Sequence, residues 1–350
     1  MNLEAHVRTT QQTVFLTVSA LVLGLLATAT SAQNGGQNAE SSSDLFTKYP
    51  AARNQSVSPP SDSAPAAGPS SASPASAMFV PQIAQYGGEA EPILVAQAEY
   101  TPDKADMVIA PQNYWAFVLD RYISQNNDGL DNGGLDNGGL AQFDYAKLKN
   151  TLADMDGLNA YIAHMAAQKP SELSRNDAMA YWANLYNALT VQVVAQNYPV
   201  KSIRKIKSGY RAGPWKRKMV VVEGEKLSLD NIEHDILRPT YKTPLVHYMV
   251  NCASIGCPNL KATPWQSATL IADQEAAARA YINSPRGVKI SDDRLQASKI
   301  YKWFKVDFGD NTASVLAHLN QYADTDLRNA LEGRRKIDKY TYDWAVNAPK

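Results

Sequence analysis

The sequence predicts a helix-rich α+β fold in which one globular domain occupies residues 107–350. Three observations lead to this class. Apolar residues recur at helical spacing in several long segments of this part of the chain. The runs typical of strands are short and do not alternate strictly with the helices. Residues 33–106 are poor in large apolar side chains, so we expect no core there.

The first third of the chain has the composition of a targeting signal and a linker. Arg8 precedes the apolar run VFLTVSALVLGLLATA, and small residues lead to a cleavage point after Ala32, which predicts a secretory signal peptide over residues 1–32. The Ser-, Pro- and Ala-rich residues 33–106 predict a disordered linker. No segment is long and apolar enough to span a bilayer comfortably. We therefore expect a protein exported to the periplasm or secreted, without stable membrane insertion.

The predicted domain opens with a helix in QNYWAFVLDRYI, followed by two tandem copies of DNGGL. We interpret the copies as a duplicated surface loop, because two five-residue units are too few for a calcium-binding repeat. The segment SRNDAMAYWANLYNALTVQVVAQNYP predicts a long central helix, capped near Ser174 or Asn176 and stopped by Pro199.

Shorter elements follow the central helix. The β-branched run KMVVVEGEKLSL, turning at Gly224, predicts a hairpin. SLDNIEHDILR predicts a short helix with Ser228 as its cap. PLVHYMVN predicts a buried strand that leads into the cysteines. Residues 267–283 and 312–323 predict helices, with a short strand at GVKIS between them.

Charge excludes one class of partner. The formal net charge is zero, and no basic stripe or cluster marks a nucleic-acid surface. We expect a small-molecule or peptide ligand and no cofactor.

The central helix carries polar residues within an apolar surround. Asp177, Asn184 and Asn187 fall on one helical face. One interpretation is a buried network that fixes helix packing, since buried amides need hydrogen-bond partners. The other is that the amides line a cleft, where they orient a histidine or donate to an oxyanion.

The segment IEHDILR places a histidine beside a carboxylate. Ile232 and Ile236 form the core-facing pair, while Glu233 and His234 lie off that stripe. A histidine next to a carboxylate is typical of a general base, and Arg238 shares the face of His234. The alternative is an amphipathic surface helix with solvated charges.

Both cysteines of the chain lie in VHYMVNCASIGCPNL. On a strand His247 and Cys252 point to opposite sides, so His234 is the better candidate base for a Cys252 nucleophile. The turn ASIG offers backbone N–H groups to an oxyanion. Export also permits a Cys252–Cys257 disulfide, whose short loop contributes on the order of 2 kcal/mol. The spacing disfavours a metal site, so we expect none.

The motifs AYWANLYNALTV, LSLDNIEHDILR, VHYMVNCASIGCPNL and YDWAVN, in this order, resemble the DUF547 family, a domain of unknown function from bacteria and plants. The resemblance covers roughly residues 115–347. The resemblance favours Cys252 as a nucleophile over an obligatory Cys252–Cys257 disulfide. The set of Cys, His and Asn or Glu is also similar to that of papain-like and transglutaminase-like thiol enzymes, which place Cys before His. The family hallmarks fall on Asn184, Tyr186, Asn187, Glu233, His234, Arg238 and Cys252.

Two functions follow from these patterns. The first is an exported thiol-dependent hydrolase or acyl transferase, with Cys252 as nucleophile, His234 as base, and Glu233 or Asn184 orienting the base. The expected substrate contacts are Arg238, as a carboxylate clamp, Asn187, Tyr186 and His247. The second is a non-catalytic exported binding module with a Cys252–Cys257 disulfide beside a buried polar network.

Overall fold

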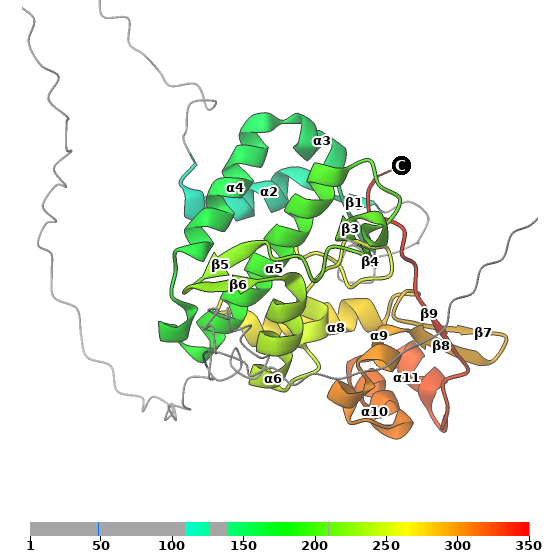
Figure 1. Ribbon diagram of the computed structural model, residues 1–350. Helices are drawn as coiled ribbons and strands as arrows, with labels where there is room; N and C mark the ends of the chain where they lie inside the picture. Colours follow the sequence, from blue (N-terminus) through cyan, green and yellow to red (C-terminus); the bar gives the residue numbers. More distant parts are fainter. Residues whose placement is uncertain (1–47, 49–108, 127–138, 209, 350) are drawn as a thin grey trace, which may run out of the picture. The chain divides into compact units, whose positions relative to one another are not determined.

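The computed structural model of the chain describes residues 48, 109–126, 139–208 and 210–349. Apart from Lys48, the predicted signal peptide and linker lie outside these residues, and so do nearly all of the DNGGL copies. The domain elements form a helix-rich α+β fold, which confirms the predicted class (Figure 1).

The helices and strands follow one another along the whole described domain. The helices are α2 (Tyr114–Tyr122), α3 (Tyr145–Asn150), α4 (Leu152–Ala166), α5 (Arg175–Asn197), α6 (Arg238–Tyr241), α7 (Val246–Met249), α8 (Leu270–Ile282), α9 (Ile300–Trp303), α10 (Thr312–Tyr322) and α11 (Thr325–Leu331), with a π-helical segment, η6, at Asn231–Leu237. The strands are β1 (Ile123–Asn126), β2 (Leu140–Phe143), β3 (Lys207–Ser208), β4 (Arg211–Ala212), β5 (Val220–Val222), β6 (Glu225–Leu227), β7 (Val288–Ser291), β8 (Arg294–Ser298) and β9 (Lys339–Thr341).

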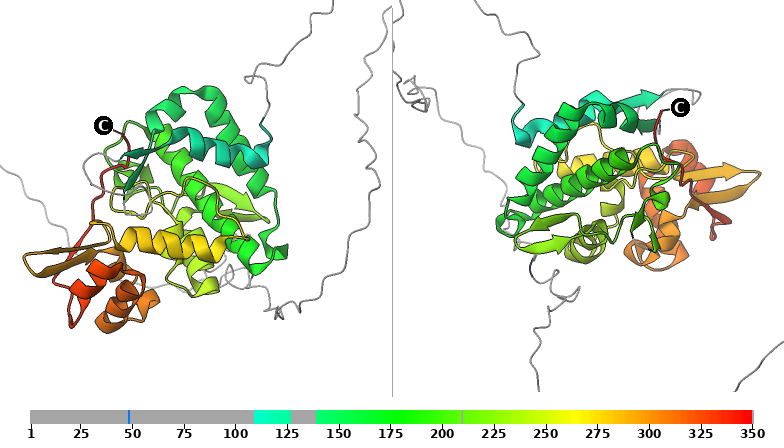
Figure 2. Two further views of the ribbon diagram at one scale, coloured as in Figure 1. Left: turned by 180° about the vertical axis from the view of Figure 1, so that it is seen from behind. Right: turned by 45° about the horizontal axis from the view of Figure 1, so that its top comes forward.

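Helix α5 is the centre of a first hydrophobic core. Ser174 caps it by accepting a hydrogen bond from Asp177 N, as the sequence predicted. Every side chain from 178 to 191 is buried, because α3, α4 and η6 pack against α5, while α2 packs on α4 (Figures 1 and 2). A helix buried all round needs partners for its polar side chains as well as its apolar ones.

The strands form small sheets at the periphery. β1 pairs with β2, β3 with β4 and β5 with β6, each antiparallel. The β5–β6 turn confirms the predicted hairpin: Glu223 and Gly224 both have positive φ, at 48° and 86°, as a tight two-residue turn requires. β7, β8 and β9 form a mixed sheet in which β8 and β9 are parallel.

A second hydrophobic core joins this mixed sheet to α10 and α11. Helix α8 connects the two cores, since Leu270 belongs to the first while Tyr281 and Ile282 belong to the second. After β9 the chain runs back toward the first core, as the red segment in Figure 1 shows. There Ser254 and Val346 form an antiparallel bridge. The predicted helices at α8 and α10 and the strand at β7 are confirmed.

The strand predicted at PLVHYMVN is wrong. Residues Val246–Met249 form the helical turn α7, in which His247 N and Tyr248 N donate to Pro244 O and Leu245 O at 3.2 and 3.1 Å. A short apolar run does not distinguish a strand from a buried helical turn. Among the described residues, no helix has the length and apolar character needed to cross a membrane.

Candidate functional site

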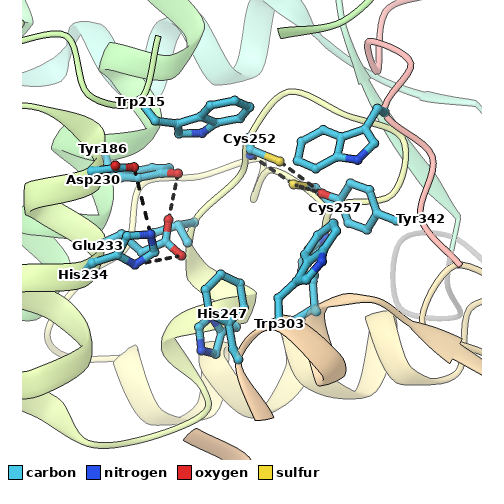
Figure 3. A pocket seen from close by; sticks show the side chains of 15 residues that line it. Tyr186, Trp215, Asp230, Glu233, His234, His247, Cys252, Cys257, Trp303 and Tyr342 are labelled. Carbon is cyan, nitrogen blue, oxygen red and sulfur yellow. Dashed lines mark hydrogen bonds and ion pairs between the residues drawn. The ribbon is translucent and has the colours of Figure 1, made fainter. Parts of the chain in front are cut away.

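A cavity of about 210 Å³ lies where the two cores meet. Val250 of the first core and Ile300 of the second both line it. In Figure 3 one wall carries acidic and histidine side chains, and the facing wall carries the sulfur atoms. The residues of these walls are Asp230, Glu233, His234, His247, Cys252 and Cys257. The aromatic part of the lining consists of Tyr186, Trp215, Trp303, Phe304, Tyr342 and Trp344.

The acidic wall is built by the π-helical segment η6. Ser228 begins this helix, because its Oγ accepts from Asn231 N at 3.2 Å, which confirms the predicted cap. Ile232 and Ile236 are fully buried and fix one face of the segment in the first core. The wider turn of a π-helix, common at functional sites, brings both Glu233 and His234 to the cavity.

Glu233 is held by the central helix. The Tyr186 hydroxyl donates to Glu233 Oε2 at 3.0 Å, and burial together with the nearby carboxylate keeps the pKa of Tyr186 well above its usual value. Tyr186 is therefore a permanent donor. His234 lies between two carboxylates, with Nδ1 at 3.9 Å from Glu233 Oε1 and Nε2 at 4.0 Å from Asp230 Oδ1.

The loop that carries the cysteines is braced from within and from the C-terminal segment. Asn251 Nδ2 donates to Pro258 O at 2.7 Å and closes the loop across its neck. Tyr281 OH donates to Gly256 O at 2.6 Å. A Cβ at Gly256 would lie 2.8 Å from Asp343 N, so only glycine allows the C-terminal segment to pass this closely.

Most backbone N–H groups of this loop already have acceptors. Cys252 N donates to Cys257 Sγ at 3.1 Å. Ala253, Ile255, Gly256 and Cys257 donate to Asn251 Oδ1, Ala345 O, Asp343 O and Ser254 O at 2.7, 2.8, 2.8 and 3.0 Å, respectively. These N–H groups are engaged within the protein, but Ser254 N is not among them, and the expectation that the ASIG turn serves an oxyanion stays a prediction.

The two thiols and Tyr342 form a hydrogen-bonded cluster. Tyr342 OH lies 3.1 Å from both sulfur atoms and 2.9 Å from Ser254 Oγ. Burial opposes ionisation of Cys257, yet donors from Cys252 and Tyr342 outweigh it and lower the pKa of Cys257 to about 7. The hydrogen bond to Cys257, together with burial, raises the pKa of Cys252 well above its ordinary value. The pair therefore ionises once near neutral pH, with the charge mainly on Cys257.

Tyr342 stays protonated, since burial and the neighbouring sulfur atoms raise its pKa well above the usual value. It is consequently a hydrogen-bond donor to the ionised thiol pair. Both cysteines are unbridged, with Cys252 partly exposed and Cys257 buried. The alternative of a disulfide between them stays a prediction.

His247 lines the same cavity as Cys252, so the expected separation of these two side chains on opposite faces is wrong. Its Nε2 is hydrogen-bonded to Asp307 Oδ2 at 2.7 Å, and its ring stacks on Phe304 with centroids 4.3 Å apart. Although burial opposes ionisation, bonds from His247 and Arg238 lower the pKa of Asp307 to about 2. Asp307 is thus a fixed anion that orients the imidazole.

Arg238 is committed to the same carboxylate. Its Nε and Nη2 donate to Asp307 Oδ2 and Oδ1 at 2.6 and 3.2 Å, and Nη1 lies 3.3 Å from His234 Nδ1. A guanidinium held in this way has little capacity left for a substrate carboxylate. The structure gives Arg238 a supporting place behind His234 and outside the cavity lining.

The amides of the central helix are structural. Asn184 makes a reciprocal pair with the backbone of Trp265, both bonds 2.9 Å long. Asn187 Nδ2 donates to Met249 O at 2.9 Å, and its Oδ1 accepts from Asn251 N at 2.8 Å. Neither residue lines the cavity, so the structure does not bring Asn184 to the predicted catalytic group.

The structure also separates the predicted nucleophile from its predicted base. Cys252 Sγ is hydrogen-bonded to Ser254 Oγ and Tyr342 OH, and within the described residues no hydrogen bond joins it to a histidine. His234 and Cys252 instead lie on different walls of the cavity (Figure 3). In the described part of the chain, no group of three or more His, Cys, Asp and Glu side chains is placed to hold a metal ion.

Comparison with known proteins places part of this site in a family. A family model described as "Protein of unknown function, DUF547" matches residues 170–282. We call residues 170–282 the DUF547 segment, after the family model that they match. The DUF547 segment contains α5, the π-helical segment and the cysteine loop, which hold three of the four motifs that carried the resemblance. The fourth motif, YDWAVN, lies beyond the match, which is shorter than the 115–347 of the resemblance. No curated protein and no solved structure matches the chain.

Several residues of the site escaped sequence reasoning. Trp303 and Tyr342 follow the DUF547 segment and line the cavity. Asp307, which also follows it, lies behind the lining and is hydrogen-bonded to His247. Arg286 donates to Cys257 O at 2.7 Å and supports the thiol loop from behind. Only Tyr342 had a signal, since it begins the quoted YDWAVN motif.

Proposed function

We propose that this chain is an exported enzyme that hydrolyses or transfers an acyl group through a thioester on Cys252. The observation that carries the proposal is the shared cavity, in which ionisable thiols face a histidine flanked by carboxylates. A nucleophile and a proton donor on facing walls can act together on a substrate bound between them. The DUF547 match itself assigns no activity.

The first step is acylation. Cys252, the more exposed sulfur, attacks the acyl carbon while its proton moves along the S–H···S contact to the Cys257 thiolate. The leaving group departs with a proton from the imidazolium of His234. Tyr342 OH, 3.1 Å from Cys252 Sγ, is placed to donate to the charge that develops beside the sulfur.

The second step releases the product. His234 takes a proton from water, or from an acceptor alcohol or amine, as that molecule attacks the thioester carbon. Cys252 leaves and recovers its proton from Cys257, which restores the starting thiolate and the protonated His234. Glu233 and Asp230 stabilise the imidazolium from either side. In this scheme Asp307 orients the imidazole of His247, which forms part of the cavity lining.

A model ester tests the proposal. The full chain with reductant is incubated with 4-nitrophenyl acetate, and nitrophenolate release is followed together with the mass of the protein. We expect one acetyl group on Cys252 and at least about a hundredfold slower release in Cys252→Ala and His234→Gln. His164→Gln, at a half-buried histidine of α4 outside the cavity lining, is the matched control. An unchanged rate in Cys252→Ala would overturn the proposal, and N-terminal sequencing of the exported chain tests cleavage after Ala32.

A further inference from the structure

The acidic wall of the cavity carries two carboxylates, which share the single imidazole of His234. Glu233 accepts from the neutral Tyr186, and within the described part of the chain no lysine or arginine pairs with it. Asp230 has no hydrogen bond to its carboxylate among the described residues. Its nearest cationic atoms are His234 Nε2 at 4.0 Å and Lys216 Nζ at 3.9 Å, the latter on a side chain that is 63% exposed.

The arginine that lies next to His234 is already neutralised. Arg238 makes two hydrogen bonds to Asp307, so its charge is not available to Glu233 or Asp230. Glu233 and Asp230 share the single imidazole of His234, and the largely exposed Lys216 contacts only Asp230, so the desolvation of the two carboxylates is only partly compensated. Consistent with this, desolvation raises the pKa of Asp230 above its usual value.

The remaining lining is a continuous group of aromatic rings. Trp215 contacts Trp344 with ring centroids 5.8 Å apart, Trp344 contacts Trp303 at 5.5 Å, and Trp303 contacts Tyr342 at 4.9 Å. Figure 3 shows Trp215 and Trp303 on either side of the open centre of the cavity. The face of an indole ring attracts cations, and it does so most strongly where water is excluded.

We propose that the cavity binds a ligand carrying an alkylammonium group, with Asp230 and Glu233 as its counter-charges and the faces of Trp215, Trp303 and Trp344 around it. This inference rests on the proposed function and names its substrate class: the acyl donor or the acceptor carries a positive charge. An anionic group would face two carboxylates and the thiolate. A neutral group would leave those charges uncompensated. A volume of about 210 Å³ suits a small head group.

Two probes of the same shape test the charge directly. Choline and its uncharged isostere 3,3-dimethyl-1-butanol are titrated into the full chain at pH 8 with reductant, and binding is followed by calorimetry and tryptophan fluorescence. We expect choline to bind at least about tenfold more tightly than the alcohol. Equal affinities, or no binding of choline, would overturn the inference.

Variants localise the effect. Glu233→Gln should weaken choline binding about tenfold and leave the alcohol unchanged, whereas Glu172→Gln, an exposed glutamate, should change neither. If Glu233→Gln does not fold, Asp230→Asn provides the same comparison. Choline affinity that is identical in the wild type and in a folded carboxylate variant would contradict the assignment.

The failure of this inference is distinguishable from the failure of the proposed function. Cys252→Ala should bind choline as tightly as the wild type, because Asp230 and Glu233 lie on the wall that faces Cys252 and the thiol is not one of the proposed ammonium contacts. Choline binding without an acetyl adduct on Cys252 would support the cation site and overturn the thioester mechanism. An acetyl adduct on Cys252 without any preference for choline would support the thioester mechanism and overturn the cation site.

Discussion

Replacing Asn187 with alanine removes the side chain that holds the backbone of Met249 and Asn251, just before Cys252, in place. The amide donates to Met249 O and accepts from Asn251 N, at 2.9 and 2.8 Å. Met249 O keeps a second donor in Trp265 Nε1, at 3.2 Å. Asn251 N, in contrast, is left buried without its acceptor.

The cost follows from these contacts. An orphaned buried N–H costs about 1–3 kcal/mol, and the lost hydrogen bond to Met249 adds about 0.5–1.5 kcal/mol. We therefore expect Asn187→Ala to lower the free energy of unfolding by about 2–4 kcal/mol. Asn197→Ala removes one bond to Val193 O at a half-buried helix end and should cost less than about 1 kcal/mol.

Urea denaturation followed by tryptophan fluorescence measures both variants against the wild type. Alkylation of Cys252 by iodoacetamide, measured in the folded state, should also change in Asn187→Ala, because Asn251 no longer holds its place before the cysteine. A catalytic role for Asn187 would give a different result. If stability stays within about 0.5 kcal/mol of the wild type while acylation is lost, the structural role argued for this amide is wrong.

Three further predictions concern ionisation. Cys257→Ser should move the pH midpoint for alkylation of Cys252 from about 7 to above 8, because the variant lacks the thiol whose pKa is about 7. Alkylation rates measured against pH test this, and an unmoved midpoint would contradict it. Asp307→Asn should lose less stability than the wild type between about pH 4 and pH 2. The pKa of Asp307 is lowered from 3.8 to about 2, so its stabilisation of the folded state is lost as its carboxyl is protonated in this range. Urea midpoints measured against pH test this. His318→Gln should lose less stability than the wild type as pH falls from about 6.5 to about 4. Burial lowers the pKa of His318 to about 4, so in this range the histidine is protonated in the unfolded chain before it is protonated in the folded one. Thermal unfolding across this pH range is the assay.

Elements with strong local signals were predictable from the sequence. The central helix has a serine cap and a following proline, and the β5–β6 hairpin has a glycine where positive φ is needed. The segment Val246–Met249, which leads to the cysteines, had no such signal, because a short and largely apolar run fits a helical turn as well as a strand. Its conformation is set by tertiary contacts, among them the two bonds from Asn187.

The site divides along the same line. Glu233, His234 and the cysteines were predictable as candidates because chemically able side chains cluster in short motifs. Their geometry was not, since it is set by partners distant in the sequence, such as Tyr186 for Glu233 and Tyr342 for the two thiols. The pairing of His247 with Asp307 spans sixty residues and leaves no local pattern.

The walls of the cavity come from different parts of the chain, and this bears on what the DUF547 match can say. Its residues 170–282 supply the thiols, the carboxylates and His234. Trp303, Tyr342 and Trp344, which give the cavity most of its aromatic surface, lie after the match. Reactive groups are thus encoded in the DUF547 segment, whereas the shape presented to a ligand depends on the segment that follows. A chain that keeps the motifs of residues 170–282 and replaces the later aromatic rings should keep its thiol chemistry and accept a different ligand.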